Sequence, residues 1–100
     1  MARVVVIGAS TGGLPAAYEL RAALGETHKV TVISNTPDFH FVPSNPWVAL
    51  GWRTRKGISF PIRPYLEKKG IEFIAEAVKE IDPAKNTVIT ESGASVPYDY

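Results

Sequence analysis

The chain has 100 residues, of which 45% are hydrophobic and 21% are charged, and its net charge at neutral pH is +1. These values describe one small globular domain or part of a larger one, and they give no reason to expect nucleic acid or an anionic membrane as a partner. The sequence contains no cysteine, which excludes thiol redox chemistry and thiolate metal sites carried by these residues. The first apolar run, Val4–Ile7, is too short for a signal peptide or a membrane span, so a cytoplasmic location is the default expectation.

The first 34 residues predict a strand, a helix and a second strand. Residues 3–7 form a β-branched run that ends at a glycine, which is typical of a strand buried on both faces of a parallel sheet. Apolar residues recur at helical spacing over residues 12–24, and Gly25 follows as a plausible C-cap. Residues 29–34, KVTVIS, alternate and are β-branched, which predicts another strand. This order is that of a βαβ unit with a right-handed crossover.

The remaining residues predict an irregular segment followed by a helix and further strands. Residues 35–58 are rich in proline and aromatic residues and have no clear period, and a loop of this length is usually functional. The elements predicted after it are one short helix and three strands, at residues 61–69, 71–78, 86–90 and 94–96. The expected fold is therefore α/β, a partial Rossmann-like unit with a parallel sheet and a C-terminal antiparallel β-meander.

The turn after the first strand reads GASTGG, which differs from the dinucleotide fingerprint G-x-G-x-x-G at its middle glycine. A strand that leads through a glycine-rich turn into a helix directs backbone N–H groups at phosphate oxygens. Gly8 permits the tight turn and Gly13 lets the helix pack closely, while Ser10 replaces the middle glycine. Serine fits if its φ is negative, and a positive φ would strain it by about 1 kcal/mol. The alternative is a glycine-rich turn that binds nothing.

The second predicted strand ends at Ser34 and Asn35, where the fingerprint has an acidic residue that accepts hydrogen bonds from the adenosine ribose. The next carboxylate is that of Asp38, further along the chain. Serine and asparagine bond a ribose hydroxyl less strongly than an ionised group does. Neither position carries an arginine or lysine for a 2′-phosphate, which disfavours NADP.

Five stretches together resemble one family: GASTGGLPAAYEL, VTVIS, FHFVPSNPWVALGWRTR, SFPIRPYLEKKGIEFIAEAVKEID and VPYDY. They are similar to the N-terminal part of the sulfide:quinone oxidoreductases, which are FAD-dependent members of the pyridine nucleotide–disulfide oxidoreductase superfamily. The resemblance covers the whole chain, and FVPSNPWVALGWR is its most specific stretch. The flavoprotein subunit of flavocytochrome c sulfide dehydrogenase is also similar, though less so in that stretch.

The resemblance implies a parent enzyme several times longer, in which cysteines beside the flavin oxidise sulfide and FAD passes the electrons to quinone. Residues 1–100 would then be a truncated N-terminal FAD-binding half-domain that is inactive alone. The parent would be peripheral on the inner membrane, attached only through its missing C-terminal parts. Within the half-domain the expected divisions are a βαβ nucleotide-binding unit, a flavin-side loop, a helix with the third strand, and a β-meander, at residues 1–34, 35–58, 59–78 and 79–100.

The resemblance also assigns cofactor-binding residues, but no catalytic or metal-binding residue in this chain. The pyrophosphate falls to the turn, the ribose to the end of the second strand, the flavin to the proline-rich loop and the adenine to the backbone at the end of the third strand. In that order the residues are Gly8, Ala9, Ser10, Thr11, Gly12, Gly13, Ser34, Asn35, Val42, Pro43 and Val78. Family members commonly have glycine where Ser10 stands. A stand-alone module for NAD or ADP and a fragment that binds nothing remain the alternatives.

The usual strand order of this superfamily is third, second, first, with the next strand beside the first. If the chain ends at Tyr100, the first strand loses that neighbour and becomes an apolar edge, which is a template for pairing with another chain. We therefore expect the fragment to self-associate through this edge, as a homodimer about a two-fold axis or in another form.

Overall fold

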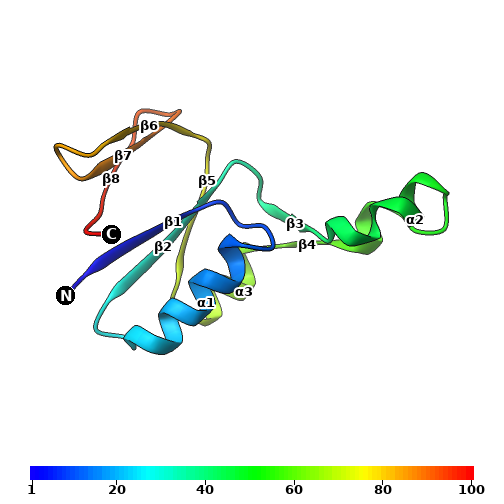
Figure 1. Ribbon diagram of the computed structural model, residues 1–100, viewed down its shortest axis with the longest axis horizontal. Coiled ribbons are helices and arrows are strands. Elements are labelled where there is room, and N and C mark those ends of the chain that lie inside the picture. The colour runs from blue at the N-terminus through cyan, green and yellow to red at the C-terminus, as the bar shows by residue number, and fades with distance from the viewer.

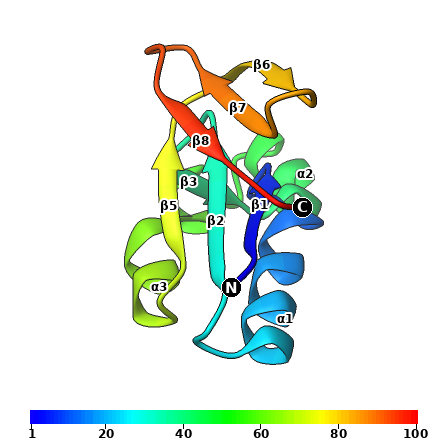
Figure 2. The ribbon, with the colours of Figure 1, turned by 90° about the vertical axis from the view of Figure 1, so that its left-hand side faces the viewer.

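The computed structural model describes residues 1–41 and 43–100 in full and Val42 by its backbone alone. Three strands form a parallel sheet in the order β1-β2-β5, and Figure 2 shows them side by side. They are β1 (Arg3–Ile7), β2 (Lys29–Ser34) and β5 (Glu72–Ala75). The predicted α/β fold and the third–second–first strand order are confirmed.

Two helices, α1 (Gly13–Leu24) and α3 (Arg63–Lys68), cover one face of this sheet. Their apolar side chains and those of the strands form the main core. The buried members of this core are Ala9, Leu14, Ala17, Val30, Val32, Ile62, Leu66, Ile71 and Phe73. Both helices therefore share one core with the sheet, and the turn that leads into α1 starts at the carboxyl end of β1.

A three-stranded antiparallel meander lies toward the other face of the sheet, near the carboxyl ends of its strands (Figures 1 and 2). Its strands are β6 (Val78–Asp82), β7 (Thr87–Thr90) and β8 (Ser95–Pro97). The turn between β6 and β7 is held by the Asp82 carboxylate, which accepts hydrogen bonds from the backbone N–H groups of Ala84 and Lys85 at 3.1 and 3.2 Å. The meander predicted from the sequence is confirmed.

The third strand is shorter than predicted, because the expected strand over residues 71–78 is two elements. Strand β5 ends at Ala75, and Val78 already begins β6 by pairing with Thr90. The backbone N–H of Glu91 also donates to the carbonyl of Ala77 at 3.0 Å. These antiparallel bonds draw the chain out of the parallel sheet directly after Ala75.

The segment expected to be irregular forms an arm that extends from the body (Figure 1). Strands β3 (Asp38–His40) and β4 (Ser59–Pro61) pair antiparallel at its base. Between them lie a 3-10 turn η1 (Val42–Ser44), the short helix α2 (Asn45–Ala49) and a second 3-10 turn η2 (Lys56–Ile58). The two strands escaped prediction because each has only three residues, too few to show a period. They are stabilised by the cross-strand rings of Phe39 and Phe60, whose centroids are 5.0 Å apart.

Strand β1 is not buried on both faces as its sequence suggests. Residues Arg3–Val6 are half-buried and the side chain of Ile7 is 49% exposed, because β1 is an outer strand of the parallel sheet.

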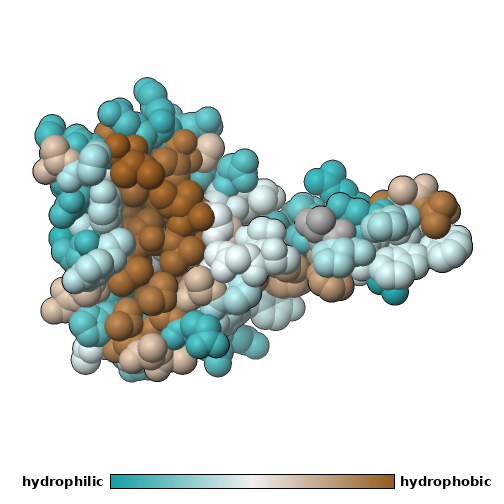
Figure 3. Space-filling model, in the orientation of Figure 1, coloured by the Kyte–Doolittle hydropathy of each residue, from teal (hydrophilic) through white to brown (hydrophobic). Residues whose placement is uncertain are grey.

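Figure 3 shows a hydrophobic band across the body of the molecule. None of the helices in the fully described ranges has both the length and the apolar character of a membrane span.

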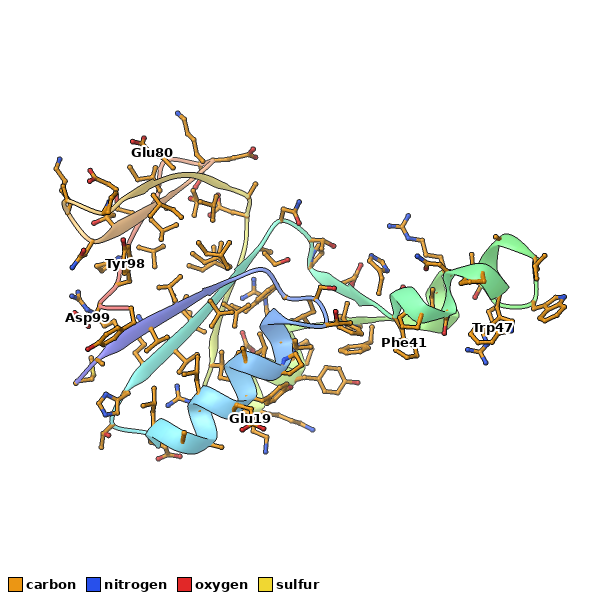
Figure 4. The ribbon with its side chains drawn as sticks, in the orientation of Figure 1. Glu19, Phe41, Trp47, Glu80, Tyr98 and Asp99 are labelled. Atoms are coloured by element: carbon orange, nitrogen blue, oxygen red, sulfur yellow. The ribbon has the colours of Figure 1, made fainter. Side chains whose placement is uncertain are left out.

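The last two residues bond to the outer edge of β1. The N–H of Val5 donates to the carbonyl of Tyr100 at 3.0 Å, and the N–H of Tyr100 donates to the carbonyl of Arg3 at 3.3 Å. This pattern is that of a parallel strand pair. The guanidinium of Arg3 holds the carboxylate of Asp99 at 3.2 Å, and this contact lowers the pKa of Asp99 (Figure 4). The outer edge of β1 is therefore covered at its start and open toward Ile7.

Candidate functional site

The turn between β1 and α1 brings the helix against the end of the strand. Gly8 has a φ of +98°, which favours glycine, and its N–H donates to the carbonyl of Ile33 in β2 at 2.7 Å. A Cβ on Gly13 would lie 1.8 Å from the carbonyl oxygen of Gly8, closer than any side chain allows. The first and third glycines therefore have the tasks that the fingerprint assigns to them.

Ser10 occupies the middle position without backbone strain. Of the residues the structure describes, Asn86 alone among those other than glycine has a positive φ, so Ser10 has a negative one. Its side chain is exposed, and its carbonyl accepts the N–H of Leu14 at 3.0 Å, which starts the first turn of α1. The replacement of glycine by serine is thus compatible with the shape of this turn.

The backbone N–H groups of residues 9–13 donate no hydrogen bond within the described part of the chain. They lie at the N-terminus of α1, where the helix dipole is positive. Ser10, Thr11 and Gly12 are exposed, so an anion from solvent can reach this backbone. A row of free donors at a positive helix end has the chemistry of a phosphate cradle.

The end of β2 lies beside this cradle. Ile7 and Ile33 are paired in register, so Ser34 and Asn35 follow at the same edge of the sheet. Ser34 is buried and its Oγ accepts the N–H of Thr36 at 3.4 Å, whereas Asn35 is exposed. Asn35 is therefore the more accessible of the two predicted ribose-binding residues.

The other predicted site residues come from separate elements. Val78 is half-buried at the start of β6, three residues after Ala75. Pro43 is an exposed residue of η1, on the arm rather than on the parallel sheet. The prediction for the Val42 side chain lies outside the described residues. The structure thus brings the turn and the end of β2 together, and places Pro43 on a different part of the molecule.

Sequence reasoning missed one carboxylate at the carboxyl ends of the strands. Ser34 and Ala75 are paired in register, and Glu76 is the residue that follows Ala75. The sequence prediction placed Glu76 inside a strand, because it took residues 71–78 as one element. The change from parallel to antiparallel pairing after Ala75 leaves Glu76 in the connection at the carboxyl end of β5.

Comparison with known proteins identifies the family. A family model described as pyridine nucleotide-disulphide oxidoreductase matches residues 2–100. The chain belongs to this family. The predicted membership is therefore confirmed, and the glycine turn lies in the matched region.

Within this family, the chain is similar to enzymes that are named for sulfide and quinone. The chain is 48% identical over 97 residues to the sulfide-quinone reductase of Aquifex aeolicus and 26% identical over 99 residues to the mitochondrial sulfide:quinone oxidoreductase of Mus musculus. Each match includes 97% of this chain, but the chain spans only 22% and 21% of the length of these two relatives. The crystal structure of the Aquifex aeolicus sulfide:quinone oxidoreductase matches with a TM-score of 0.94 over 100% of this chain and 23% of that one. The similarity to sulfide:quinone oxidoreductases predicted from the sequence is confirmed.

We predict that Gly13→Ala destabilises the chain while Gly12→Ala does not. The new Cβ at position 13 meets the Gly8 carbonyl, so helix and strand must separate, at a cost of roughly 1–3 kcal/mol in the free energy of unfolding. A Cβ at position 12 has no atom within 4 Å, and Gly12 has a φ of −93°. Urea unfolding of the two variants measures the difference, and equal stabilities would contradict the close approach.

Proposed function

We propose that this chain is the cofactor-holding part of an FAD-dependent sulfide:quinone oxidoreductase. The observation that carries the proposal is the row of free N–H groups at residues 9–13, formed where Gly8 and Gly13 let α1 meet β1. The 48% identity to a sulfide-quinone reductase supports the choice of enzyme. The flavoprotein subunit of flavocytochrome c sulfide dehydrogenase is the neighbouring alternative.

The residues present fit the ADP half of FAD. The N–H groups of residues 9–13 would bind the pyrophosphate, and the hydroxyls of Ser10 and Thr11 lie beside them. Asn35 would bond the adenosine ribose at the end of β2, and the backbone at Val78 would meet the adenine. The arm, including Pro43, would lie on the flavin side.

The chain's own contribution is to bind and orient. Bound FAD would supply two-electron transfer between sulfide and quinone, the small-molecule partners of the whole enzyme. The sequence contains no cysteine, so the thiols that react with sulfide must come from elsewhere. We therefore propose that these residues alone have no sulfide oxidation activity, and that the whole enzyme is peripheral on the inner membrane.

We predict that the purified chain binds FAD and ADP but not FMN. The proposed hydrogen bonds, from the glycine turn, Asn35 and the backbone at Val78, are all to the pyrophosphate, ribose and adenine, and FMN lacks the ADP half. The measurement is the shift in the thermal midpoint with each of the three ligands, together with the visible absorbance of the purified sample. A flavin spectrum and a rise with both FAD and ADP are expected.

Each other result has a definite meaning. A rise with ADP and none with FAD would contradict the flavoprotein proposal and favour a stand-alone dinucleotide module. A rise with FMN equal to that with FAD would place the site on the flavin rather than on the glycine turn. An unchanged thermal midpoint with all three ligands would contradict the proposal that this chain holds the cofactor.

We also predict that the 100-residue chain self-associates. The outer edge of β1 is open beyond Val5, and Ile7 is 49% exposed there, so a second copy can pair with it. Light scattering after size exclusion at micromolar concentration should give a mass above 10.9 kDa. Ile7→Lys should lower that mass, and a wild-type monomer across the concentration range would refute the prediction.

A further inference from the structure

We infer that Glu76 supplies the ribose-binding carboxylate that the end of β2 lacks, and that it selects against a 2′-phosphate. The inference rests on the proposed function, because it concerns the same dinucleotide site. The carboxylate that bonds the ribose would then follow β5, the third strand of the parallel sheet, rather than β2.

The register of the sheet places Glu76 at the required edge. Strands β2 and β5 are parallel neighbours, and Ser34 pairs with Ala75. The residues that follow these two, Asn35 and Glu76, therefore leave adjacent strands at the same carboxyl edge. Asn35 stands where the fingerprint has its acid, and Glu76 is the acidic residue that follows the neighbouring strand at this edge.

One oxygen of the Glu76 carboxylate has a hydrogen-bond partner. Thr90 is fully buried, and its hydroxyl lies 3.4 Å from Oε2 of Glu76. Oε1 of Glu76 has no hydrogen-bond partner among the described residues, and the residue is half-buried. Glu76 also takes part in no ion pair in the described ranges. A carboxylate with one free oxygen is suited to accept a hydrogen bond from a ribose hydroxyl.

The neighbouring acids are less suited to this role. Asp38 pairs with Pro61 at the base of the arm, so it has left the parallel sheet. Glu91 is exposed in the turn after β7, and only its backbone bonds to the β5–β6 connection. Glu80 lies within β6, on the meander (Figure 4). Among these acids, Glu76 is the one that follows directly on a parallel strand.

A carboxylate at this position should have opposite effects on the affinities for a ribose with free hydroxyls and for a ribose with a 2′-phosphate. An ionised acceptor strengthens binding of a ribose hydroxyl, so the wild-type chain should prefer ADP to 2′,3′-dideoxy-ADP by about tenfold. The same charge repels a phosphate on the 2′ oxygen, so adenosine 2′,5′-bisphosphate should bind poorly. Removal of the charge should lower the first affinity and raise the second.

The experiment compares Glu76→Gln with Glu91→Gln and Glu80→Gln, which make the same chemical change at nearby and distant positions. Calorimetric titration of each folded variant measures the affinities for ADP, 2′,3′-dideoxy-ADP and adenosine 2′,5′-bisphosphate. Glu76→Gln should reduce the preference for ADP over the dideoxy ligand and raise the affinity for the bisphosphate relative to ADP. The two control variants should retain the wild-type ratios. A general loss of structure would lower the affinity for every ligand. A rise in the affinity for the bisphosphate therefore distinguishes removal of the Glu76 charge from damage to the fold.

Thr90→Val gives an independent test, because it keeps the carboxylate and removes its anchor. Its preference for ADP over the dideoxy ligand should fall between those of wild type and Glu76→Gln. Equal ligand ratios in Glu76→Gln and the controls would overturn the inference while leaving the proposed function intact. Failure of the wild-type chain to bind ADP at all would overturn the proposed function, and the inference with it.

Discussion

The structure depends on the close approach between Gly13 of α1 and the carbonyl of Gly8 at the end of β1. This contact fixes where the helix begins, and so where its first N–H groups point. The same turn is tied to β2 by the bond from the Gly8 N–H to the Ile33 carbonyl. The packing of α1 on β1 and the direction of the free N–H groups of residues 9–13 thus depend on the same turn.

The register of the parallel sheet is the second constraint. Because β1, β2 and β5 are aligned, their carboxyl ends deliver the glycine turn, Asn35 and Glu76 to one edge. The meander then holds the end of β5 from the other side through Thr90. The register of the sheet therefore brings the free N–H groups of the glycine turn and two polar residues to one edge.

Local patterns predicted the βαβ unit well, because strand alternation, helical spacing and the glycines Gly8, Gly13 and Gly25 act within a few residues of each other. The three-residue strands of the arm escaped prediction, since their stability comes from the partner strand and the stacked rings of Phe39 and Phe60. The position of Glu76 at this edge was also not predicted, because it depends on where β5 leaves the sheet. Partial exposure of β1 follows from its place in the sheet and not from its sequence.

The measurement that tests the central claim most directly is an ADP titration followed by amide ¹H–¹⁵N NMR. The account predicts that the largest shifts fall on the N–H groups of residues 9–13, with smaller ones at residues 34–36 and 76–78. Because these N–H groups donate to no atom of the described chain, bonding to phosphate should move their proton signals strongly. Shifts confined to the arm, or none in the glycine turn, would contradict the claim that this turn holds the dinucleotide.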